Sequence, residues 1–74
     1  MASERDQLQA EIRRLENDVR SAKDQTDLHK SRITSERDAG KKAILRGTLA
    51  GAENMLRNAE RSLDNARSRL RGMA

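Results

Sequence analysis

Residues 45–70 read LRGTLAGAENMLRNAERSLDNARSRL, and their apolar positions recur at alternating spacings of four and three residues. This period is typical of a helix that packs an apolar stripe against another helix. Residues 8–33, LQAEIRRLENDVRSAKDQTDLHKSRI, contain a stripe with the same spacing. The first stripe comprises Leu8, Ile12, Leu15, Val19, Ala22, Thr26, His29 and Ile33, and the second Leu45, Leu49, Ala52, Leu56, Ala59, Leu63, Ala66, Leu70 and Met73. The sequence therefore predicts two amphipathic helices.

The two stripes are mirror images about a point near Gly40 and Lys41. If they pair in antiparallel fashion, the position numbers of facing residues add up to 81 or 82 along the whole seam. We therefore predict an all-α fold, a two-helix antiparallel coiled-coil hairpin in which residues 1–74 form one domain. The helices are expected at about residues 3–38 and 42–72, joined by a turn at about 39–41.

Charged residues beside the stripes support this register. When Ile12 and Leu49 occupy heptad position a, the e positions of the two helices face each other across one side of the seam. Three facing pairs there have opposite signs, namely Glu16–Arg67, Lys23–Glu60 and Lys30–Glu53. The g positions face each other on the other side, where Glu11 lies opposite Arg69.

One continuous helix paired with a second copy would give the same facing residues. The heptad phase argues against it, because the last d position of the first stripe, Glu36, and the first of the second, Leu45, are nine residues apart instead of seven. Gly40 and the absence of an apolar anchor place the turn at 39–41. Ser35 to Asp38 repeats the helix-start pattern of Ser3 to Asp6, but a turn there is expected to move the facing sum to about 70.

Composition excludes several classes of function. The chain has no Cys, and its only histidine, His29, faces Ala52 without a second ligand or a catalytic partner. We therefore predict a non-enzyme without a metal or cofactor, and we interpret His29 and Thr26 as polar seam residues that help to define the register. The charged N-terminal segment and the lack of a long apolar run predict a cytoplasmic protein of a bacterium or of a bacterial virus.

Several apolar or small residues lie outside the seam, at positions c and g in the half nearer the turn. The g positions of both helices lie on one side of an antiparallel hairpin, so these residues are expected to share one face. We call this set the docking face, and it comprises Leu28, Ile44, Thr48, Gly51 and Met55. It predicts binding to another protein, or to a second hairpin in a four-helix bundle, as in an adaptor, chaperone, virion component or inhibitor. The alternative is a scatter of ordinary exposed aliphatic residues.

The basic residues suggest a different class of function. Residues 1–40 contain eight Lys or Arg and nine Asp or Glu, a net charge of −1, whereas residues 41–74 contain eight and three, a net charge of +5. The hairpin gathers arginines at the end that bears both termini, and this basic end comprises Arg13, Arg14, Arg67, Arg69 and Arg71. The alternative function is therefore non-specific binding of a nucleic-acid backbone. The chain has no aromatic residue on which a base could stack, so any such binding is expected to be weak.

Overall fold

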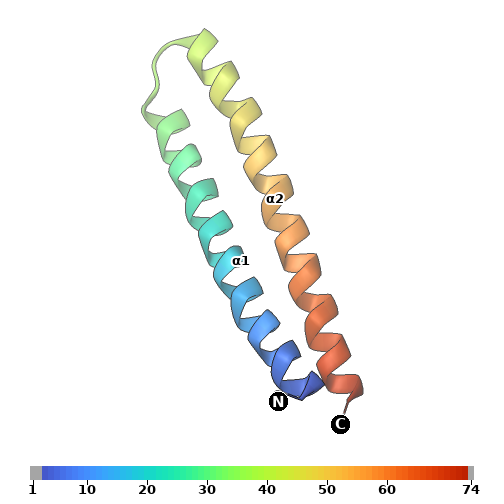
Figure 1. Ribbon diagram of the computed structural model, residues 1–74. Coiled ribbons are helices and arrows are strands. Elements are labelled where there is room, and N and C mark those ends of the chain that lie inside the picture. Colours follow the sequence, from blue (N-terminus) through green and yellow to red (C-terminus); the bar gives the residue numbers. More distant parts are fainter. Residues whose placement is uncertain (1–2, 74) are drawn as a thin grey trace.

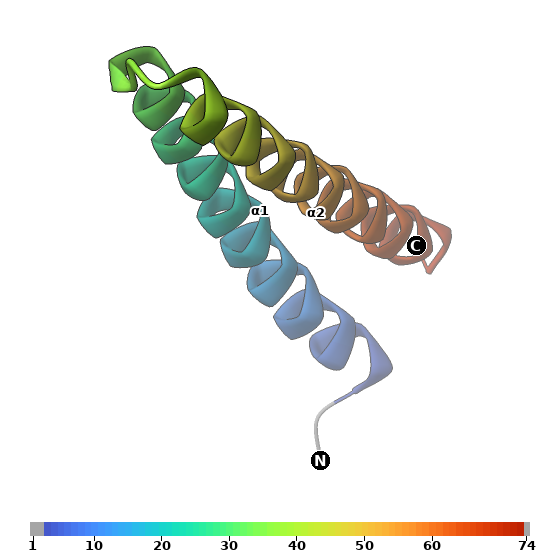
Figure 2. The ribbon, with the colours of Figure 1, turned by 90° about the horizontal axis from the view of Figure 1, so that it is seen from above.

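The structure is a computed structural model that describes residues 3–73 and consists of two long antiparallel helices. Helix α1 spans Glu4–Ser35 and helix α2 spans Ala39–Gly72. They lie side by side in a rod of 55 × 17 × 14 Å, with the start of α1 beside the end of α2 (Figure 1). Seen from above, the helices are inclined to each other rather than parallel (Figure 2). The predicted all-α helical hairpin is confirmed.

The seam between α1 and α2 contains the residues of the two stripes. The buried apolar residues are Leu8, Ile12, Leu63 and Ala66, with Leu15, Val19 and Leu70 packed against them. Thr26 is the one buried polar residue among those described. All of these residues belong to the predicted stripes, so the 4-3 spacing identified the interior of the hairpin.

Burial is uneven along the seam. The four buried apolar residues lie in the half of the rod that contains the start of α1 and the end of α2. In the half nearer the turn, the large seam residues Ile33, Leu45 and Leu49 are only half-buried. The apolar stabilisation of the hairpin is therefore concentrated at the end away from the turn.

Two ion pairs across the seam establish the register. Arg67 Nη2 lies 3.7 Å from Glu16 Oε2, and Arg69 Nη2 lies 3.5 Å from Glu11 Oε1. Both pairs were expected from the sequence, one at e positions and one at g positions. The other two expected e pairs do not approach within 4 Å in the part of the chain that the structure describes, residues 3–73. Because the observed pairs are exposed, each stabilises the hairpin by about 0.2–1 kcal/mol.

The loop comprises residues 36–38, three residues earlier than the predicted turn at 39–41. The Oε1 of Glu36 accepts hydrogen bonds from the backbone N–H groups of Arg37 and Asp38, each at 3.0 Å. Asp38 is the N-cap of α2, and its Oδ1 accepts a hydrogen bond of 2.9 Å from the Lys41 N–H. Two acidic side chains therefore determine where the loop lies, and Gly40 belongs to the first turn of α2.

The earlier loop does not change the register, contrary to the expectation of a sum near 70. Both Glu36 and Asp38 have extended backbone conformations. Facing numbers near 82 place Ser35 level with about residue 47, so α2 extends beyond α1 by about 12 Å at 1.5 Å per residue. An extended chain from Ser35 to Ala39 spans about 13 Å, and Figure 1 shows the loop rising along the rod to the start of α2. The extended loop thus compensates for its early position.

A cysteine pair tests the register. With cysteines replacing Val19 and Leu63, which lie opposite each other in the seam, we expect a disulfide within one chain on oxidation, because the chain has no other cysteine. Val19→Cys with Leu45→Cys is the control, because these positions lie far apart along the rod, and it should give no such bond. Non-reducing electrophoresis separates the products, and dimers alone from the first pair would contradict the hairpin.

Candidate functional site

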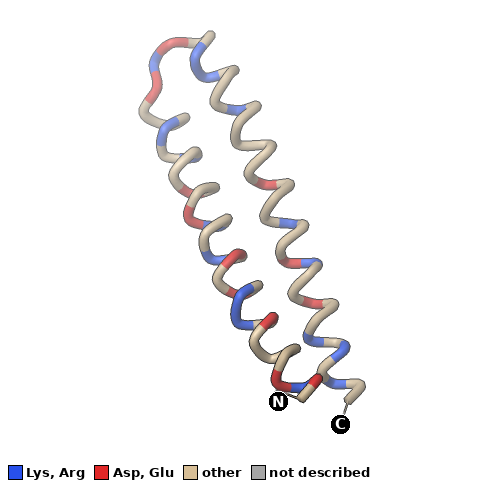
Figure 3. The backbone as a smooth tube through the Cα atoms, viewed as in Figure 1, with Lys and Arg blue, Asp and Glu red and all other residues tan. Residues whose placement is uncertain are grey.

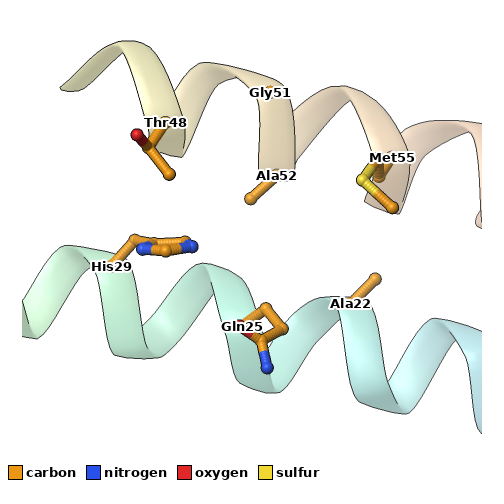
Figure 4. Close-up of a pocket in the computed structure, with 7 residues that line it drawn as sticks. All are labelled: Ala22, Gln25, His29, Thr48, Gly51, Ala52 and Met55. Carbon is orange, nitrogen blue, oxygen red and sulfur yellow. The ribbon is translucent and has the colours of Figure 1, made fainter. Parts of the chain in front are cut away.

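An open groove of about 620 Å³ lies between the two helices, on the g side of the seam and in the half nearer the turn. Its lining residues are Ala22, Gln25, His29, Thr48, Gly51, Ala52 and Met55. Figure 4 shows the side chains of Thr48, Ala52 and Met55 directed from α2 toward α1, with the ring of His29 between the helices. The groove therefore combines side chains of both helices.

The groove forms because small side chains occupy the seam at this level. Ala22 and Ala52 stand at d positions, where larger residues such as Leu8 and Leu15 fill the seam elsewhere. A second hollow shares Ala22, Gln25 and Met55 and continues away from the turn along Asp18, Ser21 and Ala59. The hairpin thus has an apolar depression that runs along one side.

Three of the five docking-face residues, Thr48, Gly51 and Met55, line this groove. Leu28 and Ile44 do not line it, and their side chains lie exposed on the surface. The sequence reasoning placed Ala22, His29 and Ala52 in the seam and did not identify them as groove residues. The available signal was the presence of alanine at neighbouring d levels, Ala22 on the first stripe and Ala52 and Ala59 on the second.

Large exposed apolar side chains are concentrated on the docking face. Leu28 is 43% exposed, Met55 69% and Ile44 72%, and in residues 3–73 the one other large exposed apolar residue is Met73. The charged residues avoid this part of α2, which has none from Gly47 to Ala52 (Figure 3). This clustering favours a shared surface over a scatter of unrelated aliphatic residues.

Gly51 keeps the groove open. A Cβ added at Gly51, or at Gly47 one turn earlier, would meet no other atom within 4 Å. Neither glycine has a positive φ, so neither is required by the backbone conformation. Each makes the helix less stable than Ala would, by about 1 kcal/mol. The groove therefore gains space at Gly51 at the expense of helix stability.

The two polar seam residues differ in their hydrogen bonding. Thr26 is buried, and its hydroxyl donates a bond of 2.9 Å to the carbonyl oxygen of Ala22 on the same helix. The Nδ1 of His29 is buried and has no hydrogen-bond partner. Such an atom costs about 1–3 kcal/mol, because it loses its bonds to water without replacement. His29 is therefore a weak point of the hairpin, beside the groove.

Ion pairs hold two arginines of the basic end on opposite sides of the seam. Arg67 is held by Glu16 on the e side of the seam, and Arg69 by Glu11 on the g side. The Arg71 guanidinium donates to the Ser68 hydroxyl at 3.0 Å. Arg13 and Arg14 take part in no ion pair in the described range 3–73. The five arginines therefore do not form one surface of unpaired positive charge.

No group of three or more His, Cys, Asp or Glu residues in the described part of the chain could hold a metal ion. Neither described helix is long and apolar enough to cross a membrane. Comparison with family models, curated proteins and solved structures gives no significant match.

Replacement of His29 by Leu should stabilise the hairpin. The substitution removes the unpaired Nδ1, and we expect a gain of about 1 kcal/mol, or roughly 4–8 °C in Tm. Thermal unfolding followed by circular dichroism measures the shift. Thr26→Val is the matched control because it removes a hydroxyl that already has a partner, and it should give no comparable gain. A lower Tm for His29→Leu would show that the imidazole stabilises the seam.

For the basic end we expect weak binding to nucleic acid. At most five arginines can contact one backbone, so the slope of log affinity against log salt for a DNA duplex should be no steeper than about −4.5. Arg67→Glu with Arg71→Glu should abolish this binding, measured by fluorescence anisotropy. Arg57→Glu with Arg61→Glu makes the same change in net charge elsewhere on α2 and serves as the control. Nanomolar affinity at physiological salt, lost only in the first variant, would instead make nucleic-acid binding the main function.

Proposed function

We propose that the chain is a small, non-enzymatic protein–protein interaction module that binds through its docking face. The observation that carries this proposal is the coincidence of the groove with the exposed apolar residues. Met55 both lines the groove and is largely exposed, and Leu28 and Ile44 extend the apolar surface beside it. A helix of a partner could lay an apolar face into a depression of this kind.

The apolar surface is sufficient to contribute to binding but not to produce tight binding alone. Complete burial of a Leu, Ile or Met side chain is worth about 1.5–3 kcal/mol. Scaled by the exposed fractions of Leu28, Ile44 and Met55, the total gain is about 3–5.5 kcal/mol. Association costs at least about 4 kcal/mol in lost freedom. A productive partner must therefore also contact the lining of the groove.

Polar substitutions on the docking face test the proposal. Leu28→Lys with Met55→Lys should abolish partner binding or lower the oligomer mass, because two charges would have to be buried in the contact. Both side chains are exposed and lie outside the seam, so helix content by circular dichroism should stay unchanged. The measurements are light scattering and capture from a nuclease-treated lysate of the source cell, which excludes partners held by nucleic acid. If neither the oligomer mass nor the capture of partners changes, the docking face does not contribute to binding.

Two of the glycines of α2, Gly47 and Gly51, provide a matched comparison for the same test. Gly51→Gln and Gly47→Gln each replace a helical glycine with a better helix former, in open space. Both should raise Tm, but only the side chain at residue 51 enters the groove. We expect weaker binding for Gly51→Gln alone. Equal effects on binding would show that the groove does not contribute.

A further inference from the structure

We propose that the partner at the docking face is a second copy of this hairpin, placed antiparallel about a two-fold axis beside Gln25 and Met55. The result is a four-helix bundle in which α1 faces α1 and α2 faces α2. This inference rests on the proposed function and names the partner. Three observations support it, namely the position of the axis, the charges on either side of it and the extent of the uncharged face.

The proposed axis lies at the middle of the contact surface. Met55 is at the midpoint of α2, which spans Ala39–Gly72, and it lines the groove together with Gln25. A two-fold axis there overlaps the second α2 with the first along its whole length. The whole broad side of the rod, 55 Å by 17 Å, measures roughly 900 Å²; α1 overlaps its copy only over about residues 15–35, so the contact is roughly 700 Å² per copy, near the ~800 Å² of a standard interface. A displaced axis would shorten the overlap of the two α2 helices.

The charges on α1 are complementary under this operation. Asp18, Gln25 and Arg32 occupy successive g positions, so Asp18 and Arg32 lie about 10 Å to either side of Gln25. The two-fold axis brings Asp18 of each copy opposite Arg32 of the other. Both side chains are available, because neither takes part in an ion pair in the described chain and their facing g residues, Ser62 and Thr48, are uncharged.

The c and g positions are uncharged between Asp18 and Arg32 on α1 and from Ile44 to Asn65 on α2. They comprise Ser21, Gln25 and Leu28 on α1, and Ile44, Thr48, Gly51, Met55, Asn58, Ser62 and Asn65 on α2. In a chain of which 38% of the residues are charged, such a face is a departure from the rest of the surface. A second copy would cover this face without burying an unpaired charge, and each apolar residue would contribute twice.

A parallel arrangement of two copies lacks these advantages. It would place Asp18 opposite Ser62 and Arg32 opposite Thr48, so that neither charge finds its complement. It would also bring two turn ends together, and residues 30–46 contain six Lys or Arg and two Asp or Glu, a net charge of +4. The antiparallel arrangement separates the turn ends. Lys41 then approaches the second copy's Arg69, whose charge is already balanced by Glu11.

Charge reversal at two positions tests the inference. Light scattering of the native chain should give twice the mass of one chain. In Asp18→Arg, and separately in Arg32→Asp, two opposite-sign contacts become two like-sign contacts, so dimer affinity should fall on the order of tenfold or more. An equimolar mixture of these two variants should form a heterodimer, because every facing pair then has opposite signs. The double variant Asp18→Arg with Arg32→Asp should also dimerise.

A cysteine variant gives an independent reading that does not depend on charge. Gln25→Cys lies beside the proposed axis, so oxidation should link two chains covalently. Asp18→Cys is the control, because two copies of residue 18 would lie about 20 Å apart, and it should give little cross-linked product. Helix content by circular dichroism confirms that each variant is folded.

The outcomes separate this inference from the proposed function. A monomeric native chain would overturn the second copy as partner, and loss of partner capture by Leu28→Lys with Met55→Lys would then still support the proposed function. The antiparallel arrangement would be overturned if the native chain dimerises, neither charge reversal lowers the dimer affinity, and oxidation of Gln25→Cys does not link two chains. Restoration of the dimer in the mixture, together with cross-linking at residue 25, would establish it.

Discussion

The packing of Leu8 and Ile12 against Leu63 and Ala66 is the constraint on which the other features depend. These side chains bring the two helices together at the end away from the turn. Ala66, which is fully buried, permits a close approach of the helices, and Glu16–Arg67 and Glu11–Arg69 flank the same packed region. Once this end is in register, the spacing of the heptads determines which residues face each other in the rest of the rod.

The same spacing accounts for the groove. A small residue at a d position leaves the seam well packed when the residue that faces it is large, as Leu15 is opposite the buried Ala66. Ala22 instead faces another alanine, Ala59, and Ala52 faces His29, whose imidazole occupies part of the space without finding a partner for Nδ1. The groove is thus a loosely packed part of the seam, with the exposed Met55 in its lining and Leu28 and Ile44 on the surface nearby. Packing that stabilises the hairpin at one end leaves apolar surface for other contacts at the other end.

Periodicity predicted the fold because the pairing of two amphipathic helices depends on residue spacing and little else. It predicted the seam and the ion pairs Glu16–Arg67 and Glu11–Arg69. It did not predict the loop, which depends on hydrogen bonds from backbone N–H groups to Glu36 and Asp38, or the ability of an extended segment to preserve register. The docking face stays a prediction. Its residues could be identified by exclusion from the seam, but the depth of the groove depends on the size of two alanines.

The uneven burial affects where along the rod the two helices separate transiently. Helical hairpins usually fray at their free ends, but here the free ends carry the buried residues, and the less packed half is joined by the loop. We therefore expect transient opening to begin in the middle and near the loop, while the helices stay joined on both sides of the opening. The reclosing helices return to the same register at a small entropic cost. The groove can consequently widen around an incoming side chain without dissociation of the two helices.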